Sequence, residues 1–548
     1  MVTATARSGR FRTFGLGLLL ITGLTVPLTQ AGASEEEAPQ AAPQSALSKV
    51  IPAPVSAEPA EGVTFELRPT SAISFDLRAP ETREVADELA GTLRPSTGYP
   101  LPVVPAVPGI QPPGISLMLG DVDPKVGDEG YQLDATDQSV KIRAKRAEGL
   151  NNGVQSLRQL LPAKVEEKTA QAGPWTVPGG KILDYPRYPY RSAMLDVARH
   201  FWSVEEVEKY IDDVAKYKIN YLHLHLTDDT GWRIAIDSWP NLTTIGGSTG
   251  VGGERPGFFT KDDYAHIVDY ARKHFMTVVP EIEGPKHSNA ARSSYAELNC
   301  DGIAPPLFED ITASPNGELC LSKEITYEFL DDVIREVAAM TPGPYLNIAG
   351  DEAFDVPAED YKAYIARVEA IVAKYDKKLM GWQELAGATD PKGTTSQIWF
   401  PDDADQPAVI DAAKNGAKMI MSPVEHAYMD MKYDEFNPEY PVGHSWAGYT
   451  EVDDAYNWDP EKVIPGLPPE AITGVSATLF TELVFERKDI DILAFPRLPA
   501  IAEIGWSPES THDWESFKNR LATHGPRWDI TDVDFYRSPQ IAWPPKVS

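Results

Sequence analysis

The feature that most constrains the fold is a repeated alternation of short apolar segments with helical patterns from Tyr190 onward. Between the segments, Ser203-Val204-Glu205-Glu206 forms a capping box ahead of a helical stripe, and the apolar residues of 325–337 recur at helical spacing. Eight such strands alternating with helices predict an α/β fold, a (β/α)8 TIM barrel. The eight candidate strands are 192–197, 221–226, 276–280, 345–349, 378–382, 397–400, 418–421 and 475–480.

The first 33 residues have the three parts of a secretory signal peptide. Three arginines precede the apolar run 14–28, and Ala31-Gly32-Ala33 follows it as a cleavage site. An uncleaved membrane anchor is the alternative, but no basic residues follow the run to stop transfer. We therefore expect a secreted protein with no membrane association after signal cleavage.

The chain between the signal and the barrel divides into two parts. Residues 34–62 are rich in Ala, Pro, Glu and Ser, a composition that predicts a disordered linker. Residues 63–187 contain strand patterns and two helical patterns but no catalytic constellation, so we expect a non-catalytic α+β domain there. The catalytic barrel is then expected over 188–548.

Charge and cysteine content limit the partners and the compartment. The chain has 81 acidic against 50 basic residues, a net charge of -31. Such a surface repels phosphate backbones, so we expect no nucleic-acid partner and a neutral or cationic substrate. Cys300 and Cys320 are the two cysteines of the chain, and in an exported protein such a pair is expected to form a disulfide.

Two adjacent acids, Asp351 and Glu352, follow the fourth candidate strand directly after Ala349-Gly350. The carboxyl ends of the strands are where a barrel of this kind keeps its chemistry. In a partly dry cleft, neighbouring carboxyls raise the proton affinity of one and leave the other ionised, so one can act as an acid and the other as a fixed charge. Taken alone, such a dipeptide could equally be a solvated surface pair.

Polar and aromatic residues also flank the other candidate strands. Acids, aromatics and arginine at one mouth suit a carbohydrate, because flat rings stack on a pyranose while charged groups bind its hydroxyls. A metal site is the alternative for the His and Asp residues of the second strand end, but zinc-type spacing is absent and we expect no cofactor and no metal. These residues are Arg191 and Asp196; His223, His225, Asp228 and Asp229; Glu281, Glu283 and His287; Trp382 and Glu384; Trp399; Tyr428 and Asp430; and Phe480 and Glu482. The long segment 422–467, rich in aromatic and acidic residues, is expected to be a functional loop.

Several segments, in the correct order, resemble those of the β-N-acetylhexosaminidases of glycoside hydrolase family 20. The resemblance runs from about Val63 to the C-terminus and includes the family's non-catalytic N-terminal domain. The segments that carry it are 191–201 (RSAMLDVARHF), 218–233 (KINYLHLHLTDDTGWR), 278–288 (VVPEIEGPKHS), 347–352 (NIAGDE) and 495–508 (FPRLPAIAEIGWSP).

The resemblance implies an exo-acting enzyme that hydrolyses terminal GlcNAc or GalNAc from chitin oligomers or glycans. In this family the acetamido oxygen of the substrate itself attacks the anomeric carbon, and the reaction retains the anomeric configuration. By resemblance, Glu352 is the general acid and base, Asp351 holds the acetamido N–H, and Tyr428 donates to the acetamido oxygen. The resemblance also implies that Asp228 and His287 control the protonation of Glu352. Arg191, Asp430 and Glu482 would bind the sugar hydroxyls. Trp382 and Trp399 would form the walls of the acetamido pocket, beside Phe480.

Four positions depart from the family's pattern. Asn347 stands where His is usual, Ala349 and Lys286 where Gly is usual, and Phe480 where Trp is usual. Every proposed chemical group is retained, so we expect activity, with changes in substrate preference, pH optimum and subsite shape. The alternatives are a catalytically weak glycan-binding protein on the same scaffold, or a relative that releases a disaccharide or a modified hexosamine.

Overall fold

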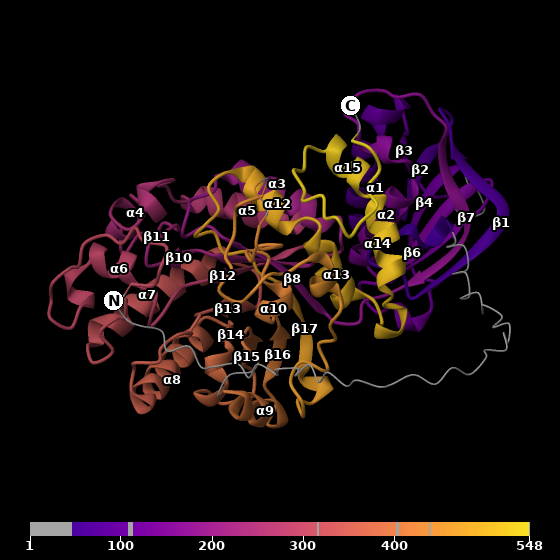
Figure 1. The fold of residues 1–548 in the computed structure, drawn as a ribbon. Coiled ribbons are helices and arrows are strands. Elements are labelled where there is room, and N and C mark those ends of the chain that lie inside the picture. Colours follow the sequence, from indigo (N-terminus) through magenta and orange to yellow (C-terminus); the bar gives the residue numbers. More distant parts are fainter. Residues whose placement is uncertain are drawn as a thin grey trace, which may run out of the picture. The chain divides into compact units, whose positions relative to one another are not determined.

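The computed structural model describes residues 46–107, 113–314, 317–401, 405–436, 438 and 440–546. The predicted signal peptide and the start of the predicted linker lie outside these residues. The described chain forms a small N-terminal domain and a barrel, which Figure 1 shows in indigo to purple and in magenta to yellow. Among the described residues, none of the helices combines the length and the apolar character that crossing a bilayer requires.

The N-terminal domain is a seven-stranded mixed sheet, in the order β1-β7-β5-β6-β4-β2-β3. Two helices, α1 (Glu81–Thr97) and α2 (Ala147–Leu160), cover its barrel-facing side (Figure 1). They are amphipathic, so Leu89 of α1 and Leu157 of α2 are fully buried in the same core as Ile142 of the sheet. The strands are β1 (Ser56–Leu67), β2 (Ala72–Phe75), β3 (Val103–Pro105), β4 (Gly114–Leu119), β5 (Tyr131–Ala135), β6 (Ser139–Ala144) and β7 (Trp175–Asp184).

The prediction of a disordered linker over 34–62 is wrong for the part that the structure describes. Ala46–Lys49 is a 3-10 turn, and β1 begins at Ser56, where it pairs antiparallel with β7. Leu47, Val50 and Ile51 are fully buried. The composition was misleading because β1 is an edge strand, whose outer face can carry Glu and whose free edge tolerates a proline.

The barrel is a closed ring of eight parallel strands, so all eight predicted strands are confirmed. The predicted segments 397–400 and 475–480 run past the true strand ends, which places Trp399 and Phe480 in loops. The strands are β8 (Tyr190–Asp196), β9 (Tyr221–His225), β12 (Thr277–Glu281), β13 (Tyr345–Asn347), β14 (Lys378–Trp382), β15 (Thr395–Ile398), β16 (Lys418–Met421) and β17 (Ile472–Ala477). A short hairpin of β10 (Thr227–Asp228) and β11 (Gly231–Trp232) follows β9.

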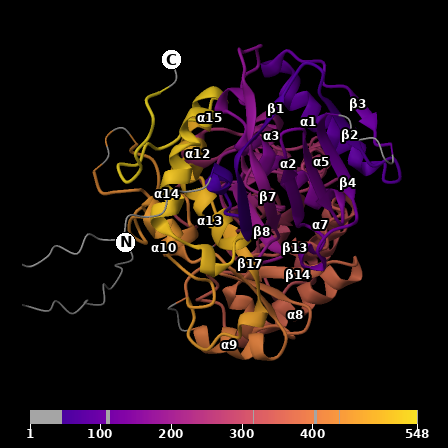
Figure 2. The same cartoon turned by 90° about the vertical axis from the view of Figure 1, so that its right-hand side faces the viewer.

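Helices surround the ring (Figures 1 and 2). The predicted capping box is present: the Ser203 side chain accepts from the Glu206 N–H, and the Glu206 side chain accepts from the Ser203 N–H. The longer helices are α3 (Val204–Ala215), α5 (Lys261–Lys273), α7 (Glu324–Met340), α8 (Ala358–Lys374), α9 (Gln406–Lys414), α12 (Arg487–Ala494), α13 (Arg497–Trp506) and α14 (Trp514–Ala522). Shorter ones are α4 (Asn241–Thr244), α6 (Asn289–Ser294), α10 (Val424–Ala427), α11 (Val452–Tyr456) and α15 (Gly525–Ile530).

Aromatic side chains fill the amino-terminal end of the barrel. Tyr190, Tyr221 and Tyr345 are the first residues of their strands, and the rings of Tyr190 and Tyr221 stack with centroids 4.2 Å apart. Val279, Met380 and Ile420 pack in the same cluster. Because this end is filled, the barrel can open only at the carboxyl ends of its strands.

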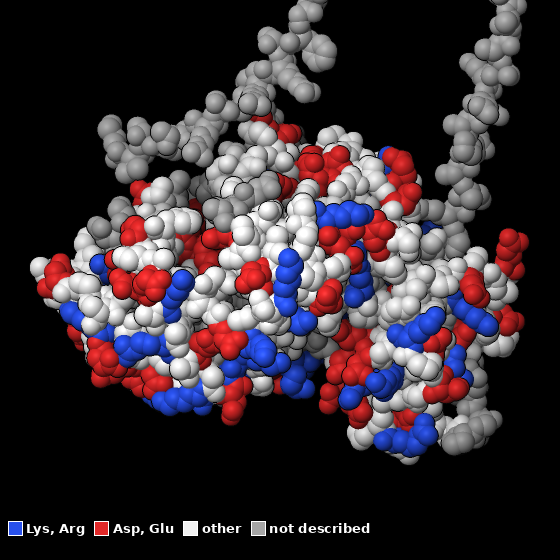
Figure 3. Space-filling model, turned by 90° about the horizontal axis from the view of Figure 1, so that it is seen from below, with Lys and Arg blue, Asp and Glu red and all other residues white. Residues whose placement is uncertain are grey.

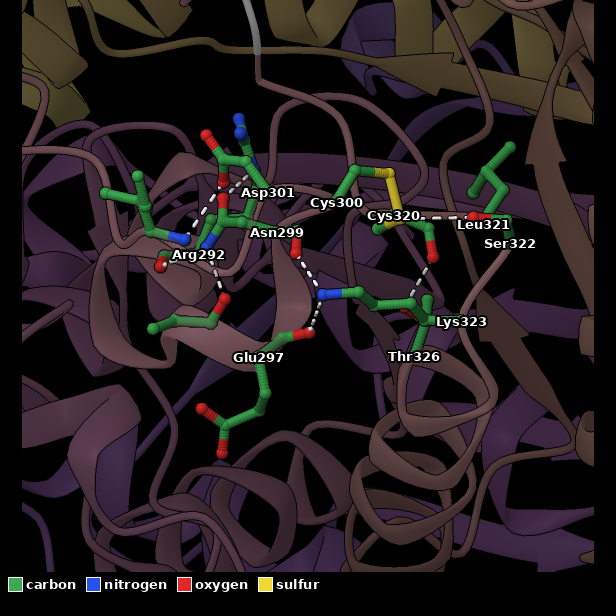
Figure 4. The surroundings of a disulfide bond; sticks show 12 residues. Arg292, Glu297, Asn299, Cys300, Asp301, Cys320, Leu321, Ser322, Lys323 and Thr326 are labelled. Carbon is green, nitrogen blue, oxygen red and sulfur yellow. Dashed lines mark hydrogen bonds between the residues drawn. A yellow bond between two sulfur atoms is a disulfide. The ribbon is translucent and has the colours of Figure 1, made fainter.

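The predicted disulfide is present. Cys300 and Cys320 are bonded, with their Cα atoms 4.9 Å apart, and close the loop between α6 and α7 (Figure 4). The Thr326 hydroxyl at the start of α7 donates to the Cys320 carbonyl at 2.7 Å, and Cys320 N–H donates to the Leu298 carbonyl at 3.0 Å. The loop is thus anchored at its base to the helix that follows it.

Acidic and basic side chains are interspersed on the molecular face shown in Figure 3. The excess of acid in the sequence is therefore not gathered into a single block on this face. Many of the surface charges are paired at short range, as Lys374 is with Asp331 at 2.8 Å.

Candidate active site

A pocket of about 440 Å³ lies at the carboxyl ends of the barrel strands. Cavities of this size hold a small ligand such as a single sugar ring. Its lining consists of Arg199, His225, Asp228, Thr230, Glu283, His287, Asp310, Ile311, Thr312, Ala313, Asp351, Glu352, Trp399, Tyr428, Asp430, His444, Trp446, Phe480 and Glu482. Of the residues to which the resemblance assigns a role, all but Arg191 and Trp382 are in this lining.

Strand register explains why the polar groups meet. Asp196, His225, Glu281 and Asn347 end four adjacent strands and lie at one level of the sheet. His225 Nδ1 is 2.7 Å from Glu281 Oε2, and its Nε2 is 2.9 Å from Asp228 Oδ2. The strand ends thus form a charged layer directly below the pocket.

Trp382, the first of the two exceptions, lies behind the pocket wall. It is 2% exposed and clusters with Tyr428 and Phe480, with ring centroids 6.5 and 6.0 Å away. Its indole N–H donates to Glu281 Oε1 at 2.9 Å, which ties the aromatic wall to the charged layer.

Arg191, the second exception, does not reach the pocket. It is the second residue of β8, at the amino-terminal end of the barrel, and its guanidinium is buried there. It donates to the carbonyls of Tyr188 at 2.7 Å and Lys218 at 2.9 Å, and it pairs with Glu129. The expectation that Arg191 binds substrate hydroxyls is therefore wrong, because it lies at the closed end of its strand.

Arg199 occupies the position at the pocket that was predicted for Arg191. It follows the carboxyl end of β8, and its guanidinium lies 2.9 Å from Asp228 Oδ2 and 3.4 Å from Glu482 Oε1. The guanidinium also lies 5.2 Å from the Phe480 ring centre. Both arginines lie in the segment 191–201. Arg191 stands at the start of the strand and Arg199 after its end, and this difference could have shown from the sequence which of them reaches the pocket.

Asp351 and Glu352 face the pocket side by side with opposite pKa shifts. Asp351 Oδ1 is buried without a hydrogen-bond partner among the described residues, and burial with help from Glu352 raises the pKa of Asp351 to about 6, against the effect of His287. A hydrogen bond from His287, with Nε2 3.3 Å from Glu352 Oε2, lowers the pKa of Glu352. The predicted divergence of the two acids is present, and in the free protein the proton favours Asp351.

His287 connects Glu352 to a second carboxylate. Its Nδ1 lies 3.6 Å from Asp228 Oδ1. Burial opposes a charge on this imidazole, but Asp228 and Glu352 outweigh it and raise the pKa of His287 well above its usual range. Burial likewise opposes ionisation of Asp228, but Arg199, His287 and His225 hold its pKa well below the usual range. The three groups form a charged row that ends at Glu352.

The far side of the pocket holds another pair of carboxyls with divergent pKa values. Burial opposes ionisation of Glu482, but Arg199 and His444 lower its pKa to about 2. Burial and the nearby Glu482 raise the pKa of Asp430 to about 7. One group accepts hydrogen bonds and the other can also donate them below neutral pH, a combination that suits sugar hydroxyls.

Two lining residues that sequence reasoning missed come from the long loop of 422–467. His444 Nε2 lies 3.4 Å from Glu482 Oε2, and the Trp446 ring lies 6.4 Å from Trp399 and 6.3 Å from Tyr428. Trp446 remains 54% exposed, as a residue at the rim of a pocket would. The length and aromatic content of the loop had indicated a functional segment without indicating these residues.

The backbone at the site is in an unfavourable conformation. Ala349, Glu352 and His287 have φ of 57°, 53° and 52°, and each pays the steric cost of about 1–2 kcal/mol that a side chain meets there. The Asn347 side chain helps to hold this turn, because its Oδ1 accepts from the Ala349 N–H at 2.8 Å. Two of the positions that depart from the family's pattern thus act together.

The groups considered for a metal are engaged with one another. In the described chain, His225, Asp228 and Glu283 form one potential ligand group, and Asp228, Asp229 and His287 form another. Both nitrogens of His225 lie within hydrogen-bonding distance of carboxylates, and Arg199 neutralises Asp228. A guanidinium at this distance also opposes a second cation electrostatically.

Comparisons with known proteins match one family over most of the chain. The model of the glycosyl hydrolase family 20 catalytic domain matches residues 188–363 and 356–509, and that of family 20 domain 2 matches 47–185. A β-N-acetylhexosaminidase of Cellulomonas fimi is 38% identical over 80% of this chain and 86% of its own.

Two solved structures are similar over nearly their whole length. The family 20 β-N-acetylhexosaminidase of Streptomyces coelicolor A3(2) has 51% identity and a TM-score of 0.87, covering 92% of this chain and 100% of that one. A mutant Streptomyces plicatus β-hexosaminidase in complex with its product GlcNAc has 52% identity and a TM-score of 0.87, covering 91% and 98%.

Proposed function

The chain belongs to glycosyl hydrolase family 20 and is a glycoside hydrolase of the β-N-acetylhexosaminidase kind, and on that premise we propose that it is exo-acting, with a retaining, substrate-assisted mechanism. The observation that carries the proposal is the meeting of Asp351, Glu352 and Tyr428 in one pocket at the open end of the barrel. A volume of about 440 Å³ suits one terminal sugar, which supports removal of single units from a chain end.

The first step breaks the glycosidic bond without an enzyme nucleophile. The acetamido oxygen of the substrate attacks the anomeric carbon, and Glu352 gives its proton to the departing glycosidic oxygen. Burial keeps the pKa of Tyr428 well above its usual range, so its hydroxyl stays protonated and can donate to the acetamido oxygen. Asp351 accepts the acetamido N–H and balances the positive charge of the oxazolinium ion.

In the second step Glu352, now ionised, takes a proton from water, whose oxygen attacks the anomeric carbon from the side that the aglycone left. The acetamido group is regenerated and the configuration is retained. In the free protein the proton favours Asp351, but the first step requires it on Glu352. An N–H donor at Asp351 lowers the pKa of Asp351 by stabilising its charged form, and this favours transfer of the shared proton to Glu352.

The sugar hydroxyls fit the charged far side of the pocket. Arg199, Asp430 and Glu482 bind them, while Trp399, Tyr428 and Phe480 enclose the acetamido group and Trp382 packs behind this wall. The product complex of the Streptomyces plicatus relative supports a GlcNAc-containing substrate such as a chitin oligomer or a glycan. The signal-peptide pattern of 1–33 and the Cys300–Cys320 disulfide support secretion.

The test compares 4-nitrophenyl β-N-acetylglucosaminide with the β-glucoside that lacks the acetamido group. We expect turnover of the acetamido substrate alone, and its loss in both Asp351→Asn and Glu352→Gln. Equal turnover of the two glycosides would contradict substrate assistance. Binding of GlcNAc without release of nitrophenol from the wild-type protein would replace the enzyme with the glycan-binding alternative.

A further inference from the structure

Lys286 lies beside the active pocket without lining it. Its Nζ is 2.6 Å from Asp355 Oδ1 and 3.2 Å from Glu318 Oε2, and its side chain is only 11% exposed. A lysine that is buried to this extent gives up hydration, which its two carboxylate partners replace.

The three residues belong to three different loops. Lys286 follows β12 and directly precedes His287. Asp355 follows β13, three residues after Glu352. Glu318 belongs to the loop closed by Cys300–Cys320, whose segment 310–313 forms part of the pocket wall.

Two of these loops are also joined through their backbones. The Ser288 N–H donates to the Gly317 carbonyl, and the Leu319 N–H donates to the Pro285 carbonyl, each at 2.9 Å. Segment 285–288 and the disulfide loop therefore form one fixed support.

The loop that carries Glu352 is held less firmly. Residues 351–357 form neither helix nor strand, and the Glu352 N–H makes a long 3.3 Å hydrogen bond to Glu384 Oε1. Glu352 itself has a φ of 53°. Such a conformation persists only when contacts from its surroundings impose it.

Two neighbouring residues of the support contact this loop. His287 lies 3.3 Å from the Glu352 carboxylate, and Lys286 lies 2.6 Å from that of Asp355. Without the second contact, the loop would be held only at Glu352 itself, by His287 and by the long hydrogen bond to Glu384. The second fixes a second point three residues further along the chain.

We propose that Lys286 is a positioning residue that clamps segment 351–357 to the support, so that the carboxyl of Glu352 stays in line with the leaving glycosidic oxygen. The inference rests on the proposed role of Glu352 as general acid. Because Asp355 is 64% and Glu318 45% exposed, these ion pairs contribute little to global stability, and their effect falls on turnover.

The test uses leaving groups that differ in their need for a proton. A 2,4-dinitrophenyl aglycone departs without protonation, whereas a methyl aglycone requires it. In Lys286→Met we expect kcat/KM, which reports the bond-breaking step, to fall about tenfold for methyl β-N-acetylglucosaminide and to change less than about twofold for the dinitrophenyl substrate, since small displacements of a catalytic group are costly. The KM values should stay near those of the wild type.

Matched variants separate positioning from general damage. Lys261→Met removes a lysine that also bridges two carboxylates, Asp237 at 2.5 Å and Glu336 at 2.7 Å, remote from the pocket, and should leave both rates unchanged. Asp355→Asn should reproduce the selective loss, and Lys286→Arg should restore most of the activity. Equal loss on both substrates, or no loss, would overturn the clamp.

Amide hydrogen exchange gives a readout that is independent of turnover. Exchange within 351–357 should be faster in Lys286→Met than in the wild type, with no change in the melting temperature. Unchanged exchange would overturn the clamp. A wild-type protein that hydrolyses neither substrate would instead overturn the proposed function, and the exchange result would still decide whether Lys286 holds the loop.

Discussion

Both ends of the barrel hold clusters of charged side chains, but the partners of these charges differ. At the closed end, Asp184 accepts from Lys218 Nζ at 2.7 Å, from the Trp506 indole at 2.9 Å and from the Tyr131 hydroxyl at 2.9 Å. At the open end, Asp351 Oδ1 and Thr230 Oγ1 are buried without a hydrogen-bond partner among the described residues.

The difference teaches how to tell a structural charge cluster from a functional one in this protein. A buried polar group without a partner is destabilising, and native proteins keep such groups where a ligand completes the bonding. Asp184 at the closed end has all its partners within the protein and ties the N-terminal domain to the barrel. The open end is complete only when a substrate supplies the missing partners.

The largest expected effect is on catalysis at the open end. Glu352→Gln removes the transferable proton while keeping the shape, so kcat for an unactivated glycoside should fall about 10²–10⁴-fold. The melting temperature should stay close to that of the wild type. Steady-state kinetics with a calorimetric scan checks both, and a retained kcat would show that another group is the acid.

The matching change at the closed end should do the reverse. Lys218→Met leaves Asp184 buried without its cation, which should lower the free energy of unfolding by about 3–5 kcal/mol. Turnover per folded molecule should be unchanged. Urea denaturation measures the stability, and kinetics with active-site titration measure the turnover per folded molecule. A variant that loses kcat but keeps full stability would show that the closed-end cluster is also functional.

The two arginines of one segment give an intermediate effect. Arg199→Met removes the cation that pairs with Asp228 and Glu482, so kcat/KM should fall about 10–100-fold. Arg191→Met should lower stability and leave kcat/KM of the folded protein as it is. If Arg191→Met lowered kcat/KM and Arg199→Met did not, Arg191 would be the substrate-binding residue.

The smallest expected effect is a gain in stability. The pKa of Asp351 is raised to about 6, so the folded state holds a proton that the unfolded state loses near pH 4. Stability therefore falls as pH rises from about 4 to 6, and Asp351→Asn removes this loss. We expect the variant to be more stable at pH 7 by about 2 kcal/mol, less than the full shift because the carboxyl is partly exposed to water. Urea melts at pH 4 and 7 test the prediction, and a variant that is less stable at pH 7 would contradict it.

Local sequence pattern determined most of the fold and the centre of the site. Buried parallel strands are short and apolar whatever surrounds them, so all eight could be found from composition and spacing. Their places near strand ends made Asp351, Glu352, His287, Asp228 and Glu482 candidates, and the family resemblance selected them and implied their roles. The fold class and the disulfide required no long-range information beyond the order of these segments.

Contacts between distant segments decided the rest. The first half of β1 looked disordered because an edge strand buries little and draws its stability from pairing with β7, far along the chain. Arg191 and Arg199 stand in the same segment, and only the direction of β8 within the closed barrel places one at the filled end and the other in the pocket. His444, Trp446 and the Lys286 bridge likewise depend on how separate loops meet, because side chains on irregular backbone carry no periodic signal that reveals their neighbours.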